Sequence, residues 1–342
     1  MSLVGDARLA FLRDLAAERI INRGLFGIAG RKPENHQPPV ASLVHSPTHL
    51  RLFSPADSTD KKSAQLTEAF VENVRATIST GLPSGAAFPT SRPNTARSFE
   101  KVVAAGVDRL LTATRHLWPD PLSATNLVQR GPRSRPKDWK GTLRRQATLA
   151  DFRAYRYLWD LMDAQEADPL LRAAIGGDYL IRPDIVIWRD PPRASDLRKP
   201  GGDELVDEAL LELAPTRLLR PSTGAVSPIL HASVSCKETL RSDRAQNVRT
   251  EALNILRNRK GRAPHIVLVT AEPLPSRLAS IAQGTGDVDS VYHVALPELR
   301  TALDQLMALD SLDWATEKKT LDALVVGERL QDFSALGLDL LL

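Results

Sequence analysis

An acid and a lysine at the ends of two apolar stretches could hold a metal ion and act on a phosphodiester. Asp184 directly precedes the stretch IVIWR, and Lys237 closes the stretch PILHASVSCK. If both stretches are strands of one sheet, their ends can bring the carboxylate and the ammonium to a common point. Mg²⁺ binds one or two carboxylates together with phosphate and water. An ammonium nearby can orient or deprotonate an attacking water and neutralise developing charge, so the pair predicts Mg²⁺-dependent phosphodiester hydrolysis.

The position two residues before the lysine departs from the usual nuclease pattern. Nucleases of the PD-(D/E)XK type normally carry a second acid there, whereas this chain has Ser235. Glu251 could supply the missing carboxylate if its helix packs back on the strand pair. The spacing is a loose motif, so the residues alone leave another interpretation open, in which Asp184 only caps a strand and Glu251 is a solvated helix acid.

A compact set of charged residues follows the lysine in the stretch RSDR. Arg241 and Arg244 can each donate two hydrogen bonds to O6 and N7 of guanine, while Asp243 can accept one from N4 of cytosine. Such a set could read both bases of a G·C pair, whereas a cluster meant only for phosphates would have no use for the acid. The residues leave an alternative equally open, which is a surface network of ion pairs with Asp243 as a helix cap.

The elements that must position these residues alternate between extended and helical patterns. Stretches rich in β-branched residues predict strands at 178–189, 228–238, 263–272 and 290–296. Helical spacing predicts helices at about 4–22, 62–79, 96–118, 206–213, 243–261, 276–283 and 297–309, two further helices that separate near Pro169, and a C-terminal tail. This alternation predicts an α/β fold with a central mixed β-sheet flanked by helices. We expect a single domain over 1–342, with a loop-rich N-terminal half (1–150) and a catalytic and recognition core (151–342).

The composition restricts the class of protein. A chain of 342 residues can bury a full core, and its formal net charge of +4 is compatible with DNA as a partner. The single cysteine, Cys236, excludes a disulfide and a cysteine-based zinc site within one chain, as expected in a reducing cytoplasm. No apolar run is long enough to span a membrane. We expect no requirement for ATP, because the sequence has no Walker-type lysine.

The block from SVSCKETLRSDR to SVYHVAL closely resembles the NgoMIV restriction endonuclease family, and the similarity extends from DYLIRPDIVI to GERLQDFSALGLDLLL. Earlier in the chain only the islands INRG, PADS and SFE match, and the Pro-rich stretch at about 31–54 looks like an insertion. The resemblance implies a bacterial, Mg²⁺-dependent type II enzyme with a PD-(D/E)XK core. It also implies a homotetramer, built as a dimer of dimers, that recognises GCCGGC in duplex DNA and leaves 5′ CCGG overhangs.

The resemblance also implies roles for individual residues. Asp184 matches a metal-binding acid, and Lys237 matches the catalytic lysine. Ser235 falls where this family too has replaced the usual acid, and Glu251 matches the acid displaced onto the following helix. Glu100, in SFE, matches an upstream active-site acid.

The residues implied to read bases fall in three parts of the chain. Those that match the readers of the inner CCGG are Arg241, Asp243 and Arg244. Arg277, in LPSRLAS, matches the arginine assigned to the outer guanine, and Asp57, in PADS, matches an acid assigned to the outer cytosine. The assignment of Asp57 depends on the short island PADS, whereas Arg277 lies in the long block of similarity.

In the implied mechanism, one or two Mg²⁺ ions are held by Asp184, the backbone carbonyl of Cys236 and Glu251, while Lys237 orients or deprotonates the attacking water. Two rival functions use the same core. One is a catalytically silent DNA-binding protein that kept RSDR, and the other is a nuclease that recognises DNA structure instead of sequence.

Overall fold

The computed structural model describes residues 3–14, 60–80, 99–117, 127–129, 149–175, 181, 183–189, 228–284, 286–309 and 314–340. Six strands form one sheet in the order in which they occur along the chain. They are β1 (Leu127–Gln129), β2 (Ile185–Arg189), β3 (Ile229–Lys237), β4 (His265–Thr270), β5 (Ser290–His293) and β6 (Leu330–Asp332). β1, β2 and β3 pair antiparallel, while β3 to β6 pair parallel, which confirms the expected mixed sheet.

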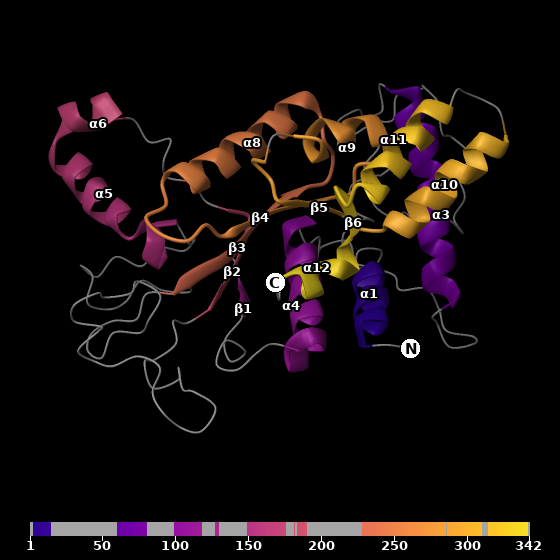
Figure 1. The fold of residues 1–342 in the computed structure, drawn as a ribbon, viewed down its shortest axis with the longest axis horizontal. Helices are drawn as coiled ribbons and strands as arrows, with labels where there is room; N and C mark the ends of the chain where they lie inside the picture. The colour runs from indigo at the N-terminus through magenta and orange to yellow at the C-terminus, as the bar shows by residue number, and fades with distance from the viewer. Residues whose placement is uncertain are drawn as a thin grey trace, which may run out of the picture.

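Helices cover both faces of this sheet. They are α1 (Leu3–Asp14), α3 (Lys61–Thr80), α4 (Phe99–Thr114), α5 (Tyr157–Ala167), α6 (Pro169–Ile175), α8 (Ser242–Arg257), α9 (Pro275–Ala282), α10 (Leu296–Ala308), α11 (Ala315–Val326) and α12 (Leu336–Asp339). In Figure 1, α8 and α9 lie along one side of the sheet, and α1, α4 and α12 lie on the other. None of the helices described is both long and apolar enough to cross a membrane.

Most of the expected helices are confirmed. The break near Pro169 is real, because Asp168 accepts hydrogen bonds from the backbone N–H groups of Leu170 (2.8 Å) and Leu171 (3.3 Å) and so caps α6. The first helix is described only as far as Asp14. Three expectations fall outside the described residues: the rest of the first helix, the insertion expected at about 31–54, and the helix expected at 206–213.

Two expectations about the chain were wrong. In the strand expected at 178–189, residues 181, 183 and 184 are not in a strand and β2 begins at Ile185, while 178–180 and 182 lie outside the described residues. The expected C-terminal tail instead contains α11, β6 and α12. Leu330 of β6 pairs with Val291 of β5 and is 1% exposed. A strand of three residues is too short to show a periodic pattern, so its pairing partner and its burial decide its structure.

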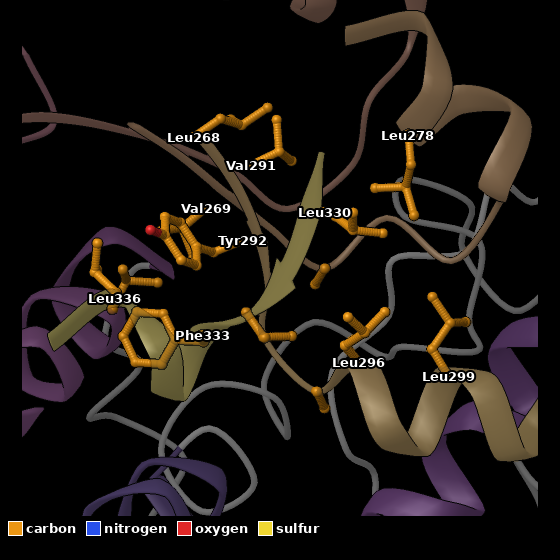
Figure 2. Close-up of a cluster of buried hydrophobic side chains, with 14 of the residues drawn as sticks. Leu268, Val269, Leu278, Val291, Tyr292, Leu296, Leu299, Leu330, Phe333 and Leu336 are labelled. Carbon is orange, nitrogen blue, oxygen red and sulfur yellow. The ribbon is translucent and has the colours of Figure 1, made fainter. Parts of the chain in front are cut away.

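Alternating side chains of the strands supply the core on both faces of the sheet. In Figure 2, Leu268 and Val291 lie on one face, while Val269 and Tyr292 point to the other face, toward Phe333. All of these side chains are buried. The unbroken apolar run of β4 is typical of a strand covered by helices on both faces.

An ion-pair network joins the two ends of the chain. Arg8 of α1 donates a hydrogen bond from Nη2 to Glu298 of α10 at 2.6 Å and one from Nε to Asp332 of β6 at 2.9 Å. The side chain of Glu298 is only 5% exposed. A buried carboxylate needs such a partner, so α1 belongs to the same packed unit as the C-terminal elements.

We expect acid to destabilise the fold through His293, whose ring is fully buried in β5. Burial lowers the pKa of this histidine to about 4, whereas an unfolded histidine titrates near ~6.5. The unfolded chain therefore takes up the proton first as the pH falls, and the free energy of unfolding should drop by about 2 kcal/mol between pH 7 and pH 5. Urea unfolding of His293→Gln should show a smaller drop over this interval. An equal drop in both proteins would contradict the assignment.

Candidate active site and base-reading surface

The start of β2 and the end of β3 bring the predicted acid and lysine together. Because the two strands are antiparallel, with Ile185 opposite Val234, Asp184 lies beside the last residues of β3. Its Oδ2 atom accepts a hydrogen bond from the backbone N–H of Cys236 at 2.9 Å and one from Lys237 Nζ at 3.1 Å. Both predicted residues therefore meet at one point of the sheet edge.

The helix α8 contributes the second carboxylate to this cluster. Ser235, which is 7% exposed, donates a hydrogen bond from its hydroxyl to Glu251 Oε2 at 2.9 Å. Lys237 Nζ lies 3.9 Å from Glu251 Oε1. Ser235 and Lys237 share a face of β3, since they are two residues apart in a strand. Glu251 is thus a member of the cluster and not an isolated solvated acid.

The two carboxylates control the charge of the lysine. Burial lowers the pKa of Lys237, but the negative charges of Asp184 and Glu251 outweigh burial, so the net shift is upward. Burial raises the pKa of Glu251, against the opposing effects of Lys237 and the Ser235 hydroxyl. Lys237 therefore keeps its proton in this arrangement, lies between the two acids and neutralises one of their charges.

The set of donors fits Mg²⁺ better than zinc. Within the described residues, no three His, Cys, Asp or Glu side chains form a group that could hold a metal ion. Zinc sites need three or four protein ligands, whereas Mg²⁺ is satisfied by one or two carboxylates with phosphate and water. The backbone of Cys236 adds an oxygen on the same side. Its N–H points to Asp184, and the N–H and C=O of one strand residue point toward the same edge.

Glu100 lies in the first turn of α4 and is half-buried. This helix packs against β3, so it runs beside the strand that carries Lys237. A role of Glu100 in the active site stays a prediction.

The stretch RSDR forms the start of α8, four residues beyond the lysine. Arg241 occupies the N-cap position without a side-chain capping bond, and Asp243 lies in the first turn. The structure therefore does not use Asp243 as the helix cap. Arg244 donates a hydrogen bond to Thr239 Oγ1 at 2.6 Å, and Asp243 forms no ion pair with any residue that the structure describes. All four residues of the stretch are exposed.

Arg277 of α9 lies beside the same helix start. It lines a hollow of about 570 Å³ between α8 and α9, together with Leu240, Arg241, Ser242, Ala245, Gln246, Arg249, Ser276 and Ser280. The structure thus places Arg241 and Arg277 around one open space, although they are far apart in the sequence. Sequence reasoning missed Gln246 and Arg249. The spacing of four residues from Arg241 to Ala245 and on to Arg249 was a usable signal, because it puts them on one helix face.

Asp57, the acid expected to accompany Arg277, lies outside the described residues. Asp60, three residues later, is described, and its Oδ2 atom accepts a hydrogen bond from Arg277 Nη2 at 3.1 Å. The chain that enters α3 is therefore in contact with α9.

Comparison with known proteins agrees with this geometry. The model of a family described as NgoMIV restriction enzyme matches residues 36–342. The chain is 38% identical over 290 residues to the type II restriction enzyme NgoMIV of Neisseria gonorrhoeae, and this region covers 84% of this chain and 90% of that protein. The mixed sheet flanked by helices is consistent with a restriction endonuclease core. The chain therefore belongs to the NgoMIV family of type II restriction endonucleases, which are deoxyribonucleases of restriction–modification systems.

Proposed function

We propose that this endonuclease cleaves duplex DNA at a GC-rich palindrome that contains CCGG, with GCCGGC as the expected site and 5′ CCGG overhangs as the products. The observation that carries the proposal is the short connection from the cluster at the end of β3 to the exposed stretch at the start of α8. Only three residues lie between Lys237 and Arg241. A base contact made by α8 would therefore set the position of the scissile phosphate against the cluster.

Asp184, Glu251 and the backbone carbonyl of Cys236 are the groups that would hold Mg²⁺. When bound, the ion would lower the pKa of the attacking water and stabilise negative charge on the phosphate. Lys237 stays cationic beside both acids, so it is suited to orient that water and to neutralise charge on a phosphate oxygen. The Ser235 hydroxyl holds the Glu251 carboxylate in place.

Base reading is proposed for the exposed groups around the hollow. Arg241 and Arg244 would donate to the guanines of CCGG and Asp243 would accept from a cytosine, while Arg277 and Asp57 would read the outer pair. A palindrome presents the same half-site twice, so two subunits related by a two-fold axis would match it. Two such dimers would form the expected tetramer.

A digest of a fully sequenced plasmid tests this proposal. Purified protein is incubated with and without Mg²⁺, and the ends of the fragments are mapped. Mg²⁺-dependent ends only at GCCGGC would support the inner and outer assignments together. Ends at CCGG with other flanking bases would keep the cleavage chemistry and reject Arg277 and Asp57 as outer readers. Random or absent ends would favour the structure-specific or the catalytically silent alternative.

The thiol of Cys236 should be dispensable, because the proposed metal contact uses the backbone carbonyl. The side chain is buried in the apolar core, so Cys236→Ala should cost about 1 kcal/mol of stability through the lost volume. Cleavage should stay within about threefold of the wild-type rate, because the backbone is unchanged. The rate is measured on plasmid at a temperature well below unfolding, and a large loss there would show that the thiol itself participates.

A further inference from the structure

One buried carboxylate contacts both parts of the chain that carry proposed base readers. Glu272 follows β4, and its side chain is fully buried. Its Oε2 atom accepts a hydrogen bond from the backbone N–H of Leu240 at 2.7 Å, and its Oε1 atom accepts one from the N–H of Leu274 at 3.2 Å. Burying a charged carboxylate is costly unless it is hydrogen-bonded and paired, so these contacts hold Glu272 firmly.

The two backbone hydrogen bonds hold the loops that carry the proposed base readers. Leu240 directly precedes Arg241 at the start of α8, and Leu274 is the N-cap residue of α9. The carboxylate of Glu272 therefore joins the β3–α8 connection to the β4–α9 connection. Any change in its charge or position acts on both helix starts.

Glu272 also faces the side chain of the proposed outer reader. Arg277 Nη1 lies 3.9 Å from Glu272 Oε1, and Nη2 donates to Asp60 Oδ2 at 3.1 Å. The guanidinium thus lies between a buried acid and a partly exposed one. Asp60 is itself held, because its other oxygen accepts a hydrogen bond from the N–H of Ser63 at 3.1 Å.

We propose that Glu272 is a positioning residue for base recognition, which holds the backbone before Arg241 and the guanidinium of Arg277 through a single carboxylate and so couples the reading of the inner and outer base pairs. This inference rests on the proposed function, since it takes Arg241 and Arg277 as readers. Glutamine at this position keeps only one acceptor oxygen, and its amide group would turn donors toward either a backbone N–H or the guanidinium. Both readers would then lose their fixed placement.

The test measures kcat/KM on three duplexes that contain GCCGGC, ACCGGT or GCGCGC, so that only the outer or the inner pairs differ from the expected site. Glu272→Gln should reduce discrimination against both altered duplexes by about tenfold. Asp60→Asn should reduce discrimination only at the outer pair, because Asp60 contacts Arg277 and not the α8 connection. Glu298→Gln is the matched control. It also removes a buried carboxylate, but one that pairs with Arg8 and not with Arg277 or the backbone at Leu240, and it should leave both ratios unchanged.

Thermal unfolding establishes that each variant is folded before its kinetics are compared. If Glu272→Gln does not fold, Glu272→Asp takes its place. Aspartate keeps the carboxylate, but its side chain is one methylene shorter and cannot reach the same contacts. The same loss of discrimination at both pairs is expected. Unchanged ratios, or a rate reduced equally on all three duplexes, would overturn the positioning role and leave the proposed function intact. Equal cleavage of all three duplexes by the wild-type enzyme would instead reject the proposed specificity, and the coupling with it.

Discussion

Replacing Lys237 with alanine should lower the rate of DNA cleavage by roughly a thousandfold and leave binding to the palindrome nearly unchanged. The ammonium lies 3.1 Å from Asp184 and 3.9 Å from Glu251, and the charges of these acids keep it protonated. Alanine removes the group proposed to orient the water and to balance the phosphate charge. The proposed base readers lie beyond the end of β3, so they would keep their contacts.

Single-turnover cleavage with Mg²⁺ measures the first effect. A gel-shift titration with Ca²⁺, another hard divalent cation that binds oxygen ligands, measures binding. The chain offers a closely matched control in Lys318, whose ammonium also bridges two carboxylates, Asp304 at 2.9 Å and Asp322 at 3.2 Å. Lys318→Ala should cleave at the wild-type rate. Normal cleavage by Lys237→Ala would remove this lysine from the mechanism.

Replacing Asp243 with alanine should weaken binding to the palindrome by roughly a hundredfold and leave binding to random DNA equal or slightly tighter. The proposed contact to cytosine would be lost in both half-sites, and each wrong or missing base contact costs about 1–3 kcal/mol. On random DNA the acid makes no base contact and only repels phosphate, so its removal is neutral or favourable. Effects in opposite directions are not expected from a residue that only supports the helix.

Gel shifts on matched duplexes at one salt concentration measure this difference, since affinity for DNA depends strongly on salt. Asp243 lies in the first turn of α8 and Asp6 in the first turn of α1. Both residues are exposed, so Asp6→Ala controls for the loss of a favourable charge at a helix start. Equal weakening on both kinds of DNA by Asp243→Ala would identify Asp243 as a structural residue.

The residue pattern alone was enough to predict the α/β class and the meeting of Asp184 with Lys237. Stretches rich in β-branched residues favour strands because these side chains pack well on a pleated, half-buried surface, and the ends of neighbouring strands share one sheet edge. The helices around Pro169, at 61–80 and at 242–257 also followed from local pattern, because spacing and capping act within a few residues. The exposed position of the charged RSDR residues could also be predicted from the sequence.

Which distant side chains touch depends on how the elements pack together. Glu251 completes the cluster because α8 packs back on β3, and its partner Ser235 is 16 residues away. Arg277 and Asp60 are separated by 217 residues, and no local period relates them. β6 forms because its residues pair with β5 and Leu330 packs into the apolar core. Such contacts depend on how whole helices pack against the sheet, which many side chains decide jointly, so no short stretch of sequence encodes them.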